Sequence, residues 1–301
     1  MRIFLTGANG FVGTWLQEHL QDKGDEVVCI SADLDLSEQD RIAKEMDNAT
    51  PDVVMHLAAW ADVATSWKDP AKVFDVNAVG TLNVLQAARQ LALPPKVVLI
   101  SSADVYGIVQ PAELPLTELS PLRPTTPYAA SKVAAEFLGL QAYLGWKLPV
   151  VTARSFTHIG PGQRDDFVVS ALARRVAAAE RAGDDSIVVG NLEAERDFTD
   201  VRDVVRAYRL LAEKGKPGET YNVCSGTSVK VADVLSFMLS LTTHPIKVKH
   251  DPSLMRQVDV PRMLGSAAKL TADTGWNPNI QLEQSMRDVF GFWQKAQAGV
   301  Q

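Results

Sequence analysis

The sequence predicts a doubly wound α/β fold, in which helices cover both faces of a parallel sheet. Short apolar runs rich in Val, Ile and Leu alternate with longer amphipathic segments through the first half of the chain. Strands that are apolar on both sides are typical of a sheet buried between helices. A glycine-rich turn follows the first apolar run directly. Strand–helix–strand alternation at this spacing predicts right-handed crossovers.

The expected elements follow one another at regular spacing in the first half and less regularly in the second. Strands are expected at 2–5, 26–30, 52–57, 96–101 and 149–153, and a further strand at 220–223 could rejoin the sheet. Helices are expected at 11–23, 37–47, 71–91, 128–144, 165–182, 201–213, 229–241 and 282–296. Ser37 is a candidate N-cap for the second of these helices. We expect residues 1–155, rejoined by 198–226, to form one domain, and 156–197 with 227–301 to form a smaller α/β domain.

Composition and charge exclude several classes of protein. The 301 residues carry 30 Lys and Arg against 36 Asp and Glu, a formal net charge of −6. A mildly acidic chain is poorly suited to a phosphate backbone, so we expect no nucleic-acid partner. No apolar run approaches the ~18 to 20 residues that span a bilayer, and the first residues lack the long apolar core of a signal peptide. We therefore expect a cytoplasmic protein without a membrane partner. The two cysteines, Cys29 and Cys224, have no ligand spacing, so no metal site is expected.

The glycine-rich turn predicts a dinucleotide site of the Rossmann type. Its spacing is Gly-x-x-Gly-x-x-Gly, placed between the first strand and the first helix. The first glycine permits the tight turn, the second lets a pyrophosphate approach the backbone, and the third lets the helix sit close to the sheet. Free N–H groups at the helix N-terminus then face the phosphates. The residues expected to line this part of the site are Gly7, Asn9, Gly10, Phe11, Val12 and Gly13.

The choice between NAD and NADP depends on the segment after the second strand. Asp33 lies 20 residues after Gly13, where a carboxylate would accept a hydrogen bond from a ribose 2′-hydroxyl. No Arg or Lys occurs between Lys23 and Arg41 to receive a 2′-phosphate. This favours NAD(H), although Asp33 could equally be a solvated loop carboxylate, and NADP(H) stays open. The reduced form of either cofactor would be the hydride donor.

A tyrosine and a lysine four residues apart indicate proton-transfer chemistry. Tyr128 and Lys132 share one face of the helix expected at 128–144. Both side chains ordinarily titrate near ~10. A nearby cation favours the phenolate, so we expect Lys132 to lower the pKa of Tyr128, which can then exchange a proton with an alkoxide or alcohol. Ser102, at the carboxyl end of a strand, could hydrogen-bond the same oxygen. Taken alone, Tyr-x-x-x-Lys is common on helix surfaces and more often structural.

Together these motifs resemble the extended short-chain dehydrogenase/reductase family. The resemblance is carried by the glycine turn, by His56-Leu57-Ala58-Ala59, by Ser101-Ser102 and by Tyr128 with Lys132. It implies that residues 1–155 with 198–226 bind NAD(P), that the smaller domain binds a nucleotide-diphospho-sugar, and that Ser102, Tyr128 and Lys132 are catalytic. The further cofactor contacts that it implies are Asp33, Asp35, Leu36, Leu57, Ala58, Ala59, Asn77, Tyr128 and Lys132.

The second half is similar to GDP-4-keto-6-deoxy-D-mannose reductases. The matching segments are 154–163, 190–201, 221–226, 256–260 and 274–278. The similarity implies that Arg196 and Arg256 hold the diphosphate, and guanidinium groups suit phosphate geometrically. It implies that Asp259 holds ribose hydroxyls. Asp104 and Thr157 are the other candidate substrate contacts, although the family usually carries an amide at the position of Thr157. Each arginine considered alone would be interpreted as a surface ion pair.

The residues after Ser102 help to choose among the reactions of this scaffold. A 4,6-dehydratase resembling this chain carries an acid pair after the catalytic hydroxyl, to protonate the leaving oxygen and to deprotonate carbon. Here Ala103 occupies the first position and only Asp104 follows, which disfavours dehydration. A UDP-sugar 4-epimerase needs only the tyrosine and a cofactor that stays bound. The second-half motifs favour a 4-keto reductase.

We therefore expect hydride transfer from NAD(P)H to C4 of GDP-4-keto-6-deoxy-D-mannose, which yields GDP-D-rhamnose. The alternatives are a nucleotide-sugar 4-epimerase, a GDP-mannose 4,6-dehydratase and, least favoured, a non-catalytic nucleotide sensor. Members of the family are commonly dimers, so a homodimer is expected. The helices expected at 71–91 and 128–144 are candidates for its interface.

Overall fold

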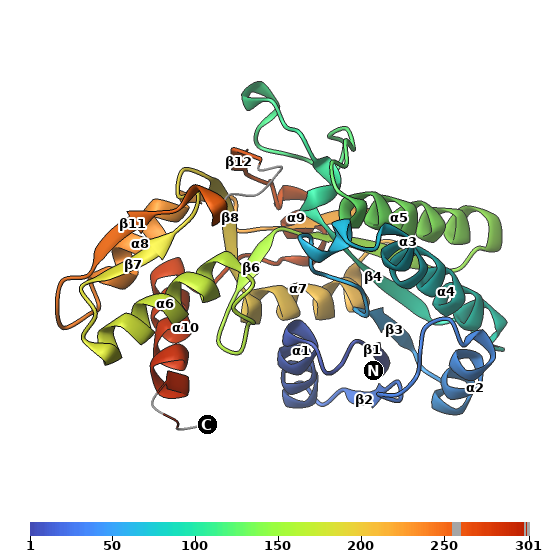
Figure 1. Ribbon diagram of the computed structural model, residues 1–301. Helices are drawn as coiled ribbons and strands as arrows, with labels where there is room; N and C mark the ends of the chain where they lie inside the picture. The colour runs from blue at the N-terminus through green and yellow to red at the C-terminus, as the bar shows by residue number, and fades with distance from the viewer. Residues whose placement is uncertain (255–259, 298, 300–301) are drawn as a thin grey trace.

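The computed structural model describes residues 1–254, 260–297 and 299, and it contains the expected parallel sheet. Six strands run in the order β2-β1-β3-β4-β5-β9, and every neighbouring pair is parallel (Figure 1). The strands are β1 (Arg2–Thr6), β2 (Glu26–Cys29), β3 (Val53–His56), β4 (Lys96–Ser102), β5 (Val150–Ser155) and β9 (Thr220–Val223). The strand expected at 220–223 is therefore present and pairs with β5. The predicted fold class is confirmed.

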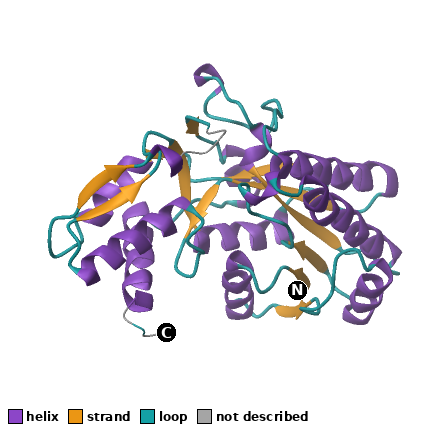
Figure 2. Ribbon diagram, in the orientation of Figure 1, coloured by secondary structure: helices purple, strands orange, loops and turns teal. Residues whose placement is uncertain are grey.

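Helices cover both faces of this sheet (Figure 2). On one face lie α1 (Phe11–Asp22), α7 (Val201–Lys214) and α9 (Ala268–Thr274). On the other lie α2 (Gln39–Ala49), α3 (Pro70–Phe74), α4 (Gly80–Gln90) and α5 (Pro127–Trp146). Side chains alternate between the two cores, because Ile3 and Leu5 pack toward α1 and α7 whereas Phe4 packs toward α2 and α4.

A second group of elements has a core of its own. The helices α6 (Val168–Ala182), α8 (Val231–Leu239) and α10 (Leu282–Gln297) pack against the parallel pair β7 (Ser186–Val189) and β11 (Lys247–His250). Four further short strands form another sheet around β8, namely β6 (Thr157–Ile159), β8 (Glu195–Asp200), β10 (Ser228–Lys230) and β12 (Arg262–Met263). The sequence did not predict these six strands. Three of them, β6, β10 and β12, have only two or three residues and leave almost no periodic signal, and β8 is largely polar.

Local chemistry moves some of the expected helix boundaries. The helix expected from Ser37 begins at Gln39, because the Asp35 carboxylate accepts a hydrogen bond from the Ser37 N–H (2.8 Å) and closes a turn there. Ser37 is therefore not the N-cap. The helix expected at 71–91 contains a π turn, η2 (Asp75–Val79), between α3 and α4. The other short helical turns are η1 (Thr65–Trp67), η3 (Ala103–Tyr106), η4 (Pro111–Glu113) and η5 (Pro252–Leu254).

The strand order places a crevice at the carboxyl edge of the sheet. β1 pairs with β2 on one side and with β3 on the other. The connections that follow β1 and β2 therefore cross the sheet in opposite directions, which makes this position a topological switch point. Ligands of open α/β sheets bind at such a switch point, outside the carboxyl ends of the strands. The glycine turn after β1 and the catalytic candidates after β4 both lie at this edge.

Candidate active site

A large cavity, about 1180 Å³, opens at this edge and receives side chains from both groups of elements. Its volume is at the upper end for a single small-molecule site, so it offers room for more than one ligand. The residues expected from the sequence that line it are Gly7, Asn9, Gly10, Phe11, Val12, Gly13, Asp35, Leu36, Leu57, Ala58, Ala59, Ser102, Asp104, Tyr128, Lys132, Thr157 and Arg196. The structure thus brings most of the predicted site residues together.

The glycine turn has the shape of a phosphate cradle. Gly7 has a φ of +75°, and a Cβ there would lie 2.7 Å from the backbone N of Ala58. A Cβ on Gly13 would overlap the Gly7 carbonyl oxygen. Helix α1 begins after Gly10 with no side-chain cap and no acidic residue in its first turn. Its N-terminal N–H groups are therefore available to an anion, as a dinucleotide pyrophosphate requires.

A buried chain of hydrogen bonds fixes the opposite wall of the cradle. Thr81 donates to the Asn77 carbonyl (2.6 Å), so its oxygen accepts from His56 Nε2 (3.0 Å). His56 Nδ1 is then the acceptor for the Thr6 hydroxyl (2.7 Å), whose oxygen accepts from the Ala58 N–H (3.2 Å). Only the neutral ring with hydrogen on Nε2 satisfies this order. Burial lowers the pKa of His56 to about 3, which agrees with that tautomer.

Asn77, which was expected to contact the cofactor, lies behind the cavity wall rather than on it. The side chain is buried in the π turn η2 and does not line the cavity. Its amide accepts from the Trp60 N–H (2.7 Å) and donates to Ser131 Oγ (2.9 Å), and Ser131 donates to the Tyr128 carbonyl (2.7 Å). Asn77 therefore links the cavity-lining segment at Trp60 to α5, the helix that carries Tyr128.

Asp33 also lies away from the cavity, unlike its neighbours Asp35 and Leu36. Its exposed carboxylate pairs with the Arg41 guanidinium of α2 (2.8 Å), and that hydrogen bond lowers the pKa of Asp33. Arg41 lies eight residues after Asp33 in the chain but beside it in the fold. Because α2 folds an arginine back onto Asp33, this site does not separate a ribose 2′-hydroxyl from a 2′-phosphate.

The three catalytic candidates converge at the end of β4. Ser102 is the last residue of that strand, and its hydroxyl lies close enough to the Tyr128 phenol to affect the pKa of that phenol. Tyr128 stands in the first turn of α5, which the Thr126 side chain caps by accepting from the Ala129 N–H (3.0 Å). One turn further along, Lys132 Nζ donates to the Ile100 carbonyl of β4 (2.9 Å). A phenol and a hydroxyl can therefore share one oxygen of a ligand at this point.

The protonation state of Tyr128 differs from the expectation. Burial raises the pKa of Tyr128, the Asp104 carboxylate raises it further, and the hydrogen bond from Ser102 opposes this only in part. The expectation that Lys132 lowers this pKa is wrong, because desolvation of the phenol dominates. Burial also lowers the pKa of Lys132, to about 8, against the opposing charge of Glu136. At neutral pH the phenol is protonated and the lysine is charged.

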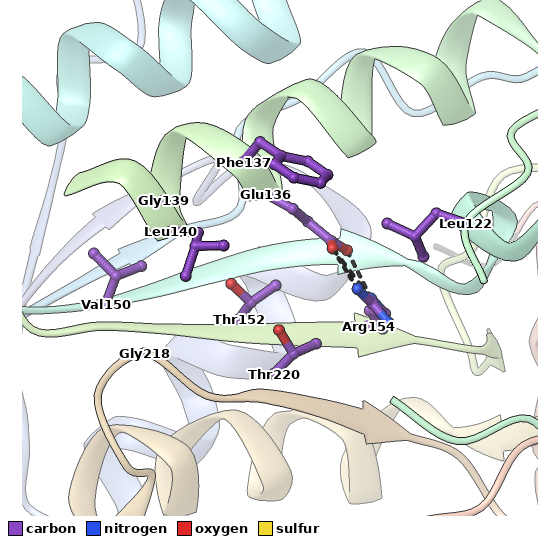
Figure 3. Close-up of a pocket in the computed structure, with 10 residues that line it drawn as sticks. All are labelled: Leu122, Glu136, Phe137, Gly139, Leu140, Val150, Thr152, Arg154, Gly218 and Thr220. Carbon is purple, nitrogen blue, oxygen red and sulfur yellow. Dashed lines mark hydrogen bonds and ion pairs between the residues drawn. The ribbon is translucent and has the colours of Figure 1, made fainter. Parts of the chain in front are cut away.

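A buried ion pair that the sequence reasoning missed supports this arrangement from behind. Glu136, one turn after Lys132, binds Arg154 of β5 through two nitrogens, the shorter contact being 2.7 Å (Figure 3). Both side chains are 7% exposed. Glu136 also accepts from Ser101 Oγ (2.5 Å), next to Ser102. The pair borders a crevice of about 150 Å³ that shares no lining residue with the cavity. The four-residue spacing from Lys132 was the available signal.

The structure describes two of the four candidate substrate contacts in the second half of the chain. Arg196 lines the cavity and donates to the carbonyl of Val260 (2.7 Å), and Thr157 of β6 lines it as well. Arg256 and Asp259 lie outside the described residues. The cavity is also lined by residues outside the expected set of site residues, namely Trp60, Ser155, His158, Gln163, Arg164 and Tyr208.

Within 1–254 and 260–297, no cluster of three or more His, Cys, Asp or Glu side chains is arranged to bind a metal ion. Among the helices of the same part of the chain, none combines the length and the apolar character needed to cross a bilayer.

Comparisons with known proteins agree with this geometry. Residues 4–289 match the family model described as GDP-mannose 4,6 dehydratase. A GDP-6-deoxy-D-mannose reductase of Pseudomonas aeruginosa is 38% identical over 298 residues, 97% of each chain. The solved structure of RMD from Pseudomonas aeruginosa, complexed with NADPH, covers 98% of this chain and 100% of its own, at 36% identity and a TM-score of 0.91. The Thermus thermophilus UDP-glucose 4-epimerase, complexed with NAD, covers 98% and 100%, at 29% identity and a TM-score of 0.87. The predicted resemblance is confirmed: this chain belongs to the GDP-mannose 4,6-dehydratase family of extended short-chain dehydrogenases/reductases.

Proposed function

We propose that this protein reduces the C4 keto group of GDP-4-keto-6-deoxy-D-mannose to give GDP-D-rhamnose, with NADPH or NADH as the hydride donor. The observation that carries the proposal is that Ser102, Tyr128 and Lys132 line the same cavity as the glycine cradle, with Tyr128 and Lys132 one helical turn apart. The Pseudomonas aeruginosa relatives, a GDP-6-deoxy-D-mannose reductase and a structure with NADPH, support the substrate class and the cofactor.

The chain's own residues would handle the developing charge. Bound NAD(P)H supplies the hydride. Ser102 donates a hydrogen bond to the carbonyl oxygen and orients it, and Tyr128 gives its proton to the same oxygen as the alkoxide forms. The proton leaves a phenolate, which the Lys132 ammonium on the same helix face stabilises. Lys132 also holds the cofactor ribose. The raised pKa of Tyr128 keeps the phenol protonated before each turnover.

The substrate would lie between the two groups of elements. Residues 1–155 with 198–226 would bind the cofactor, and 156–197 with 227–301 the sugar nucleotide, except that α9 packs on the cofactor-binding sheet. Arg196 faces the cavity, where its guanidinium would hold the diphosphate. Asp104 and Thr157 would contact the sugar. On the sequence resemblance alone, Arg256 would contact the diphosphate and Asp259 the ribose.

Two other reactions remain candidates on this scaffold. The fold similarity to a UDP-glucose 4-epimerase favours epimerisation as the second candidate. Dehydration is less favoured, because the position after Ser102 is the buried Ala103, which supplies no acid. The three reactions differ in their need for added reductant, since only the reductase consumes reduced nicotinamide.

An absorbance assay tests the assignment. Purified protein is incubated with GDP-4-keto-6-deoxy-D-mannose and NADPH, or NADH, and loss of the reduced nicotinamide is followed with time. We expect oxidation together with a GDP-6-deoxyhexose product. Parallel reactions contain UDP-galactose, with UDP-glucose sought as the product, and GDP-mannose, with a 4-keto sugar sought. No oxidation with either cofactor would remove the reductase assignment.

We also propose that two copies form a homodimer through α5 and the neighbouring α3 and η2. On α5, Phe137, Leu140 and Leu144 are exposed at spacings of three and four residues, which places them on one face. Phe74 of α3 and Val79 of η2 are exposed as well, and these elements pack beside α5. A second copy would cover this apolar surface. The cytoplasmic location stays a prediction.

A further inference from the structure

A second serine–tyrosine pair stands next to the catalytic one. Ser155 is the last residue of β5 and is the register partner of Ser102 on β4. Its Oγ lies 2.5 Å from the hydroxyl of Tyr208, which comes from α7 on the opposite face of the sheet from α5. Both residues line the cavity. The proposed reaction uses neither of them.

The burial of Tyr208 decides the direction of this hydrogen bond. The side chain is 0% exposed, and within the described residues its hydroxyl has no hydrogen-bond partner other than Ser155. A buried O–H group without an acceptor is costly, so Tyr208 donates and Ser155 Oγ accepts. The Ser155 proton then has no acceptor among the described residues. Ser155 is thereby left as a hydrogen-bond donor on the cavity surface.

The position of Ser155 limits which hydrogen-bond acceptor of a ligand can lie beside it. Adjacent strands lie about 4.8 Å apart, so Ser155 is one strand spacing from Ser102. A hydride donor must approach the carbon whose oxygen Ser102 and Tyr128 hold to within about 3.5 Å. The pyridine ring of a bound cofactor would therefore come beside Ser155. The carboxamide is the polar substituent of that ring, and its oxygen is an acceptor.

We propose that Ser155, held in place by Tyr208, donates a hydrogen bond to the carboxamide oxygen of the nicotinamide and so fixes which face of the ring meets the sugar. Ser155 is a cofactor-binding residue in this scheme and Tyr208 a positioning residue. The inference rests on the proposed use of NAD(P)H but not on the identity of the sugar.

Comparison of two ligands isolates this contact. Dissociation constants are measured by calorimetry for NADPH and for 2′-phospho-ADP-ribose, which lacks the nicotinamide ring, on wild type, Ser155→Ala and Tyr208→Phe. We expect Ser155→Ala to weaken NADPH binding about tenfold, the equivalent of one good hydrogen bond. Tyr208→Phe should weaken it about threefold, because the serine hydroxyl then rotates freely. Binding of 2′-phospho-ADP-ribose should be unchanged in both variants.

A matched control comes from another buried tyrosine. The Tyr106 hydroxyl donates to Asn222 Oδ1 (2.6 Å), and Tyr106 does not line the cavity. Tyr106→Phe should leave the ratio of the two dissociation constants at its wild-type value. Equal weakening of both ligands by Ser155→Ala would overturn the proposal in favour of a purely structural role. No weakening of either ligand would overturn it too. If wild type binds neither ligand, the proposed function fails instead.

Discussion

At the scale of single residues, the site depends on which protonation states the fold permits. Tyr128 is buried close to Asp104, and both features raise the pKa of the phenol. A raised pKa suits a residue that donates a proton, whereas it would hinder one that must begin as a phenolate. The raised pKa therefore gives Tyr128 the protonation state of a proton donor, which the sequence alone leaves ambiguous.

Replacing Tyr128 tests the proton-donor role. Tyr128→Phe removes the acidic hydroxyl and keeps the ring, so turnover should fall by about 10²- to 10⁴-fold. NADPH affinity, measured by fluorescence titration, should stay within about twofold, because the pyrophosphate cradle is untouched. Tyr143→Phe, in the same helix but outside the cavity, serves as the control. Turnover near the wild-type rate would show that another group supplies the proton.

His56 predicts a pH dependence of stability. Its pKa is about 3 in the folded protein, whereas the ordinary value is 6.5. As the pH falls below 6.5, the unfolded chain binds a proton that the folded chain rejects, so the free energy of unfolding decreases until the pH nears 3. One such proton corresponds to about 1.4 kcal/mol per pH unit.

Denaturant unfolding across this pH range measures the effect. In His56→Gln the amide keeps a hydrogen-bond acceptor and a donor but does not titrate. The slope of the free energy of unfolding against pH should therefore decrease by up to about 1.4 kcal/mol per pH unit. An unchanged slope would mean that His56 is protonated in the folded state. Thr199→Val provides a control, because the Thr199 hydroxyl is buried without a hydrogen-bond partner.

At the scale of elements, close approach of backbone segments shapes the cofactor site. The turn after β1 packs against the segment after β3, and α1 packs against the turn. The glycine pattern predicted the close packing of α1. The contact with the segment after β3 was not predicted, because it joins residues about 50 positions apart. The π turn η2 was not predictable in the same way, since Asn77 adopts its position through partners on distant segments, Trp60 and Ser131.

Gly13→Ala tests the packing of α1 on the turn. The added Cβ would meet the carbonyl oxygens of Gly7 and Ala8, which are backbone atoms and cannot rotate away. We expect α1 to shift, the affinity for NADPH to fall by at least about tenfold, and the melting temperature to decrease. Gly291→Ala is the matched control, because a Cβ there meets nothing within 4 Å and should be neutral or slightly stabilising. Wild-type affinity in Gly13→Ala would contradict this account of the cradle.

At the scale of the whole molecule, the cavity needs both groups of elements. The six-stranded sheet and its helices supply the glycine turn and the catalytic candidates, whereas Thr157 and Arg196 come from the smaller sheet. The two faces of α5 differ. The inner face carries the buried Tyr128 and Lys132, whereas the outer face exposes three apolar side chains. Dimerisation through α5 would therefore also support the catalytic helix.

A charge on this face should separate the dimer. We expect the double variant Phe137→Glu with Leu144→Glu to sediment as a monomer where wild type sediments as a dimer, because two buried carboxylates per copy lack partners. Val188→Glu, at an exposed apolar position on β7, should leave the mass unchanged. A monomeric wild type, or a double variant that remains dimeric, would show that this face is not the interface.

The sequence by itself determined the fold class, the glycine cradle and the Ser102, Tyr128 and Lys132 set, because each is written in local spacing or strand–helix order. Tertiary structure alone decided what depends on residues far apart in the chain. Arg41 folds onto Asp33, Glu136 meets Arg154, Tyr208 reaches Ser155, and burial reverses the expected shift of the Tyr128 pKa. Local periodicity reports which side of an element is buried. It carries no information about which charge or hydroxyl another element brings to that side, and that choice sets the electrostatics of the site.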